Sequence, residues 1–187
     1  MRKVITLAFI YLCCIYSLTA QWSFVGAAGF SAGNSEYTSL AFHDTVPYIA
    51  YCDWGHGQKA TVKKYNGTSW ETVGTEGFSA GTVRYTSLAI NNGTPYVVYS
   101  DQGHGHKATV MKFNGSSWES VGPAGFTPGS VSHPSIAFYN GERYIAFKDF
   151  ANASKASVMK FNGASWEFVG PAGFTRSEER RVGKECC

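Results

Sequence analysis

The chain has very little cysteine outside its two ends. Of its five cysteines, Cys13 and Cys14 lie in the first 20 residues, and Cys186 and Cys187 are the last two residues. Only Cys52 stands between them, in a segment rich in strand-forming residues. An internal disulfide framework is therefore excluded for the central region, and we expect Cys52 to be a small buried apolar residue.

The central region also lacks an excess of charge of either sign. The chain contains 16 Lys and Arg against 13 Asp and Glu, but six of the basic and three of the acidic residues lie in residues 1–20 and 176–187. Residues 21–175 retain ten of each and have a net charge of zero. This balance argues against nucleic acid or an anionic membrane surface as a partner.

Helical patterns and catalytic motifs are missing as well. No long segment repeats its apolar residues with a helical period. The chain contains no Gly-x-Ser-x-Gly elbow, no Gly-rich phosphate loop and no His-Glu-x-x-His motif. The Asp-box of sialidases fails too, because Tyr65, Phe113 and Phe161 stand where its Asp belongs. We therefore predict no catalytic residue and no cofactor.

What the sequence does contain is a repeat of 48 residues that runs without a gap. The strings KYNGTSWETVG, KFNGSSWESVG and KFNGASWEFVG begin at Lys64, Lys112 and Lys160. Four sets of residues keep the same spacing: Trp22, Trp70, Trp118 and Trp166; Phe30, Phe78, Phe126 and Phe174; Asp53, Asp101 and Asp149; Lys59, Lys107 and Lys155. A period of this size indicates a solenoid, a propeller or an array.

The pattern inside one unit favours a propeller. Short apolar or alternating runs at 85–90, 95–101, 106–113 and 118–122 are separated by turns rich in Gly and Asn. Four antiparallel strands in a repeat of this length are typical of a β-propeller blade. We predict an all-β chain with three full four-stranded blades, at about 37–74, 85–122 and 133–170, in which the repeated Trp packs between neighbouring blades.

The segment 22–26 resembles a fourth, outer strand that arrives before any first, second or third strand. Many propellers close by lending such an N-terminal strand to the last blade. Propellers typically have four to eight blades, so three blades do not close a ring. The hypothesis is that residues 21–175 are an incomplete propeller, whose partners include further blades of the same chain.

The two ends of the chain differ from the repeats. Residues 1–20 have a basic start, an apolar stretch and small residues at the end, which predicts a secretory signal peptide and a secreted or cell-surface protein. The segment is too short for a membrane span. Residues 176–186 look like the translation of a common sequencing adapter, so 176–187 is interpreted as a non-native tail. The alternative is a genuine basic tail that binds nucleic acid.

Two known groups of proteins resemble the repeats. The ending aromatic-Asn-Gly-x-Ser-Trp-Glu-x-Val-Gly resembles the kelch repeat, although the kelch double glycine is absent. The gap-free repeats are similar to secreted propeller arrays of Bacteroidota, and tachylectin-type lectin propellers have a similar repeat length and outer-strand Trp. These resemblances cover residues 21–175 and imply the fold; they indicate no single function and carry over no catalytic residue.

Candidate ligand-binding residues follow from blade geometry. The connection between blades and the loop after the second strand should share one face, and both are long here. Ligand sites favour loops on a rigid scaffold. The candidates on this face are Asp53, Trp54, His56, Arg84, Asp101, His104, His106, His133 and Asp149. Asp with His can ligate metal, but the third blade has no such His, so no metal site is predicted. The alternative is that each Asp caps its own loop through backbone amides, with Lys107 and its equivalents pairing with it or solvated.

Two functions remain open at this point. The first is a secreted or surface-attached propeller that binds a glycan or an extracellular protein without catalysis. The second is the propeller part of a secreted enzyme, carbohydrate-active or an oxidase, whose site lies in further blades or in an attached domain.

Overall fold

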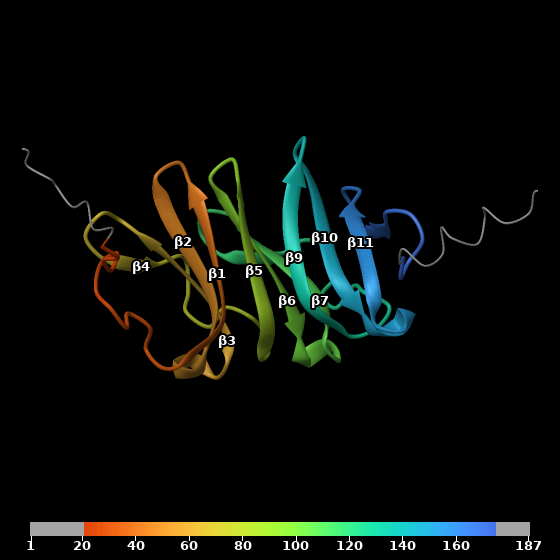
Figure 1. The fold of residues 1–187 in the computed structure, drawn as a ribbon, viewed down its shortest axis with the longest axis horizontal. Helices are drawn as coiled ribbons and strands as arrows, with labels where there is room; N and C mark the ends of the chain where they lie inside the picture. Colours follow the sequence, from red (N-terminus) through yellow and green to blue (C-terminus); the bar gives the residue numbers. More distant parts are fainter. Residues whose placement is uncertain (1–20, 175–187) are drawn as a thin grey trace, which may run out of the picture.

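A computed structural model describes residues 21–174 of the chain (Figure 1). The predicted signal peptide, residues 1–20, and the predicted non-native tail, residues 176–187, lie outside the described residues. The described part is all-β apart from three short 3-10 turns, η1 (Trp54–His56), η2 (Gln102–His104) and η3 (Phe150–Asn152). Within residues 21–174 no helix is long and apolar enough to cross a membrane.

The strands form three four-stranded antiparallel sheets, each in simple sequential order. The first blade contains β1 (Ser35–His43), β2 (Val46–Asp53), β3 (Lys59–Tyr65) and β4 (Trp70–Thr72). The second contains β5 (Val83–Asn91), β6 (Thr94–Asp101), β7 (Lys107–Phe113) and β8 (Trp118–Ser120). The third contains β9 (Val131–Tyr139), β10 (Glu142–Asp149), β11 (Lys155–Phe161) and β12 (Trp166–Phe168). The prediction of three full four-stranded blades is confirmed.

The first strand of each blade begins two residues earlier than the repeat predicted. Each contains a bulge, at which Tyr37, Tyr85 and His133 adopt left-handed backbone angles with φ of 53°, 55° and 51°. A bulge leaves one residue unpaired and bends the strand. The strand therefore continues through a position where the sequence had indicated its start.

Two hydrophobic cores lie between successive blades, and the middle blade contributes to both. Along β6, Val97 and Tyr99 face the first blade, whereas Tyr96 and Val98 face the third, because side chains alternate along a strand. The first strands pack in sequence, β1 against β5 and β5 against β9 (Figure 1). Burial of large apolar side chains between sheets is the main stabilising contribution, at about 1.5–3 kcal/mol for each one.

The repeated Trp joins each blade to the preceding segment. The Trp118 indole Nε1 donates a hydrogen bond to the Val73 carbonyl at 2.8 Å, and its ring stacks on Phe78 with centroids 4.0 Å apart. The same contacts recur at the other units: Trp70 with Val25 and Phe30, and Trp166 with Val121 and Phe126. We call this arrangement the Trp clasp. It confirms the expectation that the Trp packs between neighbouring blades.

The segment 22–26 differs from the expected outer strand. It forms no strand in the structure, and Trp22 and Phe24 are 98% and 82% exposed. The reason is that no third strand of a preceding blade lies beside it within the described residues. The Val25 carbonyl nevertheless accepts the hydrogen bond from Trp70. The segment 22–26 thus accepts a Trp hydrogen bond from blade 1, as residues 73–74 accept one from blade 2.

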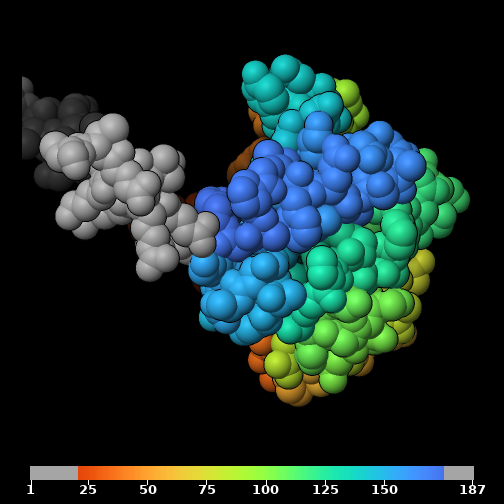
Figure 2. Space-filling model, turned by 90° about the vertical axis from the view of Figure 1, so that its right-hand side faces the viewer, coloured from red at the N-terminus to blue at the C-terminus, as the bar shows by residue number. Residues whose placement is uncertain are grey.

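The two outermost side faces of the three blades expose apolar residues that are buried at the inner junctions. On β1, Leu40 is 59% exposed, whereas its equivalents Leu88 and Ile136 are each 6% exposed. At the opposite end, Val169 is 42% exposed. Figure 2 looks onto this outer face of the third blade, in blue. Each end therefore has the surface of a blade whose neighbour is not among the described residues.

Candidate functional site

The three repeated aspartates lie beneath the loop that follows the second strand of each blade. Asp53 is fully buried and accepts hydrogen bonds from the Gly55 amide at 3.0 Å, the Thr61 hydroxyl at 3.0 Å and His56 Nδ1 at 2.9 Å. The equivalent contacts of Asp101 are with Gly103, Thr109 and His104, and those of Asp149 are with Ala151, Ser157 and Asn152. The interpretation of the Asp as a cap of its own loop is confirmed.

The hydroxyl group beside each aspartate also accepts a hydrogen bond from the segment that follows the fourth strand. Thr61 Oγ1 donates to Asp53 and accepts a hydrogen bond from the Gly77 amide at 2.8 Å. Thr109 with Gly125 and Ser157 with Gly173 repeat the contact. The two long loops of each blade therefore share one face, as the blade geometry predicted, and we call it the loop face.

One charged cluster on the loop face belongs to the first blade alone. His56 Nε2 lies 3.3 Å from Glu76, and Glu76 Oε1 lies 2.5 Å from Lys63 Nζ. The hydrogen bond from Lys63 holds the pKa of Glu76 below its usual value. The sequence analysis missed this pair. The signal was in the aligned repeats, where Met111 and Ala124 replace Lys63 and Glu76 together.

Two predicted residues, Arg84 and His106, line a common pocket between blades 2 and 3 on the loop face. Its volume is about 220 Å³, and the aromatic rings of Tyr85 and Phe150 also line it. Phe150 is 47% exposed, and Lys148 Nζ lies 5.1 Å from its ring centroid. No carboxylate is among the residues that line this pocket.

A third predicted residue, His133, lies in an adjoining pocket of about 240 Å³. Its ring stands 4.2 Å from that of Tyr85, which in turn stands 4.8 Å from that of Tyr37. These three aromatic residues occupy the bulges of the first strands, so they form a ladder across the blades. Tyr37 and Tyr85 were missed by the sequence analysis, although they share a repeat position with His133.

The remaining predicted residues lie apart from these pockets. Asp53, Asp101 and Asp149 are 0–2% exposed and lie below the loop surface. Trp54 is 46% exposed on η1, and His56 and His104 cover the buried aspartates. Within residues 21–174 no three His, Cys, Asp or Glu side chains converge as metal ligands would.

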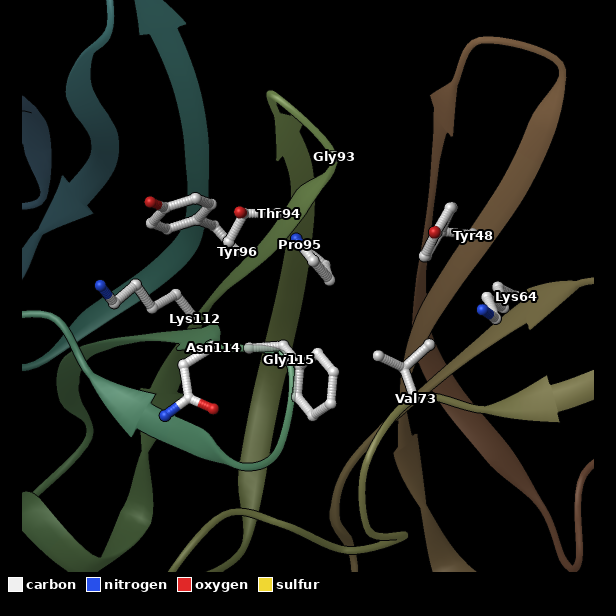
Figure 3. Close-up of a pocket in the computed structure, with 11 residues that line it drawn as sticks. Tyr48, Lys64, Val73, Gly93, Thr94, Pro95, Tyr96, Lys112, Asn114 and Gly115 are labelled. Atoms are coloured by element: carbon white, nitrogen blue, oxygen red, sulfur yellow. The ribbon is translucent and has the colours of Figure 1, made fainter.

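A further cleft, of about 520 Å³, lies on the opposite face, between blades 1 and 2 (Figure 3). It is bordered by the turns at Gly93 and Asn114. Tyr48, Lys64 and Val73 come from the first blade, and Pro95 faces them from the second (Figure 3). We call this the turn-face cleft.

The sequence matches no known family model and no curated protein. Several solved structures resemble the chain in fold. A polysaccharide lyase of family PL25, an ulvan lyase bound to -[GlcA(1-4)Rha3S]-, superposes with a TM-score of 0.54 at 16% identity. The fold is that of a β-propeller.

Two further solved structures share the propeller fold. The xyloglucan PUL protein GH43B of Bacteroides ovatus has a TM-score of 0.54 at 14% identity. A family 117 glycoside hydrolase of the marine bacterium Zobellia galactanivorans has a TM-score of 0.53 at 13% identity. The three superpositions, in the order given, include 78%, 77% and 82% of this chain. They include 40%, 32% and 60% of the respective proteins, so the chain spans less than two thirds of each.

Proposed function

We propose that the protein is a secreted or surface-attached propeller module that binds glycans in the pocket between blades 2 and 3 on the loop face. The observation that carries the proposal is the combination of two aromatic rings, Tyr85 and Phe150, with Arg84 and His106 around one pocket. Ligand sites combine apolar or aromatic walls with a few placed polar groups. A sugar ring presents an apolar face to the rings and hydroxyls to the polar groups.

The charge of the pocket favours an acidic glycan. Arg84 lines the pocket, Lys148 lies over the Phe150 ring, and no carboxylate opposes them in the lining. A guanidinium binds carboxylate or sulfate groups through paired donors. The ulvan lyase that the fold resembles was solved with an acidic, sulfated oligosaccharide, and this supports acidic glycans as the first probes.

The buried aspartates support binding rather than hydrolysis by these residues. Most glycosidases use two carboxyl groups that reach the scissile bond from either side. Here Asp101 and Asp149 are 2% and 0% exposed, and each accepts two hydrogen bonds from its own loop and one from a hydroxyl on the following strand. Asp101 and Asp149, the carboxylates nearest in sequence to the pocket, thus stabilise the loops.

The alternative function is the propeller part of a carbohydrate-active enzyme. It is supported by the names of the similar structures, which are a polysaccharide lyase and glycoside hydrolases, and by the share of those proteins that the chain spans, from 32% to 60%. The catalytic groups would then lie in blades or domains beyond the described residues.

Affinity electrophoresis followed by calorimetry tests the proposal. Probes are oligosaccharides of ulvan and polygalacturonate, with xyloglucan as a neutral comparison. Phe150→Ala and Arg84→Ala should each weaken binding roughly tenfold, the loss of about 1.4 kcal/mol expected for one good contact. Trp54→Ala is the matched control, because Trp54 holds the same repeat position but lies outside the pocket. Unchanged affinity in both pocket variants would contradict the proposal, and release of unsaturated or reducing sugars would favour the enzyme.

A further inference from the structure

The turn-face cleft has a near copy at the next blade junction. Eleven residues line the cleft between blades 1 and 2. At the junction of blades 2 and 3, 48 residues further on, nine of these eleven positions hold the same residue type. The two exceptions are Thr94 and Pro95, which are replaced by Glu142 and Arg143. The molecule therefore contains two versions of one lining, which differ at two adjacent side chains.

In the second version the side chain of Arg143 fills the space. Its guanidinium carbon lies 5.4 Å from the centroid of the Tyr96 ring and 5.7 Å from that of Phe161. Arg143 Nη2 also donates to the Tyr96 hydroxyl at 3.2 Å. The two distances from the guanidinium carbon to the ring centroids fall within the range of cation–π contacts. A Tyr and a Phe from neighbouring blades thus hold a guanidinium between them.

The first version offers the same groups without the arginine. Tyr48 and Phe113 are the counterparts of Tyr96 and Phe161, and both line the open cleft. Pro95 stands in the place of Arg143, and its ring is much shorter than an arginine side chain. Among the described residues, the Tyr48 hydroxyl has no protein partner corresponding to the Arg143 group that binds Tyr96.

We propose that the turn-face cleft binds a guanidinium group from outside, the side chain of an arginine in an extracellular partner polypeptide. A guanidinium is planar, always charged and weakly hydrated, so it stacks on aromatic faces better than an ammonium does. The internal arginine at the neighbouring junction identifies the ligand chemistry. The site lies on the face opposite the proposed glycan pocket, so it adds a second binding function that does not depend on the first.

Two lysines, Lys64 and Lys112, line the cleft, and both are compatible with a bound cation. Lys64 lies opposite Glu71 in the β3–β4 pair, as Lys112 lies opposite Glu119 in the β7–β8 pair. Lys112 forms an ion pair with Glu119 at 3.0 Å at the junction that Arg143 fills. A lysine at this position therefore coexists with a guanidinium, because a carboxylate on the adjoining outer strand compensates its charge.

The first experiment is a titration of the protein with N-acetyl-L-arginine methylamide, followed by NMR. The resonances of Tyr48 and Phe113 should shift, and the lysine analogue should bind roughly tenfold more weakly. Pro95→Arg should abolish the response, because the new side chain fills the cleft as Arg143 does at the same repeat position. Binding that persists in a folded Pro95→Arg variant, or equal binding of lysine, would overturn the proposal.

A second variant keeps the test decisive if Pro95→Arg does not fold. Arg143→Ala creates an empty copy of the cleft, and added arginine should raise its melting temperature more than that of the parent protein. Peptides containing Arg should bind more tightly than free arginine if a polypeptide is the natural ligand, whereas equal affinity would assign the site to free arginine. A glucuronate-containing disaccharide that shifts the same resonances, or the absence of any rescue, would contradict the guanidinium assignment.

Discussion

At the scale of single residues, the buried aspartate organises each loop of the loop face. Asp101 is 2% exposed and accepts hydrogen bonds from the Gly103 amide, the Thr109 hydroxyl and His104. The 48-residue spacing identified this Asp in the sequence. The Asn, Gly and His residues that follow it in the repeats are compatible with a loop cap and with a ligand site. The Thr hydroxyl that decides between them lies eight residues away, across a strand pair. Only the fold brings these two residues together.

Removal of this carboxylate should be costly. Asp101→Ala removes the acceptor of the buried Thr109 hydroxyl proton and of the partly buried Gly103 amide, so we expect the free energy of unfolding to fall by about 2–4 kcal/mol. Urea denaturation measures the change. The adjacent Gln102→Ala is the control, since exposed substitutions of this kind stay within about 0.5 kcal/mol. Equal effects of the two substitutions would argue against the structural role of Asp101.

The buried thiol should make the protein sensitive to alkali. Burial, with a smaller contribution from Glu36, raises the pKa of Cys52 from its ordinary value near 9.0 to about 11. The folded protein therefore keeps its proton at a pH where the unfolded chain loses it. This stabilising contribution is complete below about pH 9 and is lost as the pH rises through about 11.

The alkaline effect can be measured with one variant. Between about pH 8 and about pH 11, the urea midpoint of the parent protein should fall further than that of Cys52→Ala. Tyr51 and Tyr99, whose pKa values burial also raises, remain in both proteins and so cancel in the comparison. Parallel curves for the two proteins would show that Cys52 makes no pH-dependent contribution.

At the scale of elements, the short fourth strand matters mainly through the Trp that begins it. The sequence alone predicted the strand, its turn and the packing role of the Trp. It did not predict the bulge in each first strand, because Tyr37 and Tyr85 have ordinary strand propensity and the left-handed angle is imposed by the pairing. It also did not predict Arg143 as a filler between blades, since this requires knowing which side chains of two sheets face each other.

The Trp clasp provides its own control within the chain. Trp118→Ala removes a ring stacked on Phe78 and a hydrogen bond to the Val73 carbonyl, so it should destabilise the protein by about 3–5 kcal/mol. Trp22→Ala alters the same repeat position but a side chain that is 98% exposed, and should change stability by less than about 0.5 kcal/mol. Chemical denaturation monitored by circular dichroism compares the two. Similar losses would mean that the clasp is not the source of the stabilisation.

At the scale of the whole molecule, the described blades present two complementary unfilled sides. Leu40 and Phe42 at one end are 59% and 58% exposed, and Val169 at the other is 42% exposed. Their counterparts at the inner junctions pack against the neighbouring blade, and stability in repeat architectures depends largely on such neighbour interfaces. The hypothesis of an incomplete ring therefore remains a prediction that concerns association as well as fold.

Residues 21–175 produced alone should self-associate, because exposed apolar faces of this kind bind one another. Size-exclusion chromatography with light scattering measures the mass, and a version extended by further blades to ring closure should be monomeric. Leu40→Lys, which places a charge on the exposed face of β1, should reduce the association without lowering stability. A monodisperse monomer of 21–175 that unfolds cooperatively would contradict the incomplete-ring hypothesis.

The Trp clasps all point backwards along the chain, and this has a consequence for biosynthesis. Each indole binds a carbonyl 45 residues earlier, at Val25, Val73 and Val121. A chain is made from its N-terminus, and domains begin to fold during synthesis. The carbonyl acceptor of every clasp is therefore synthesised before its Trp, so each new blade docks on a segment that already exists. We therefore expect the blades to assemble in the order of the chain, from blade 1 to blade 3.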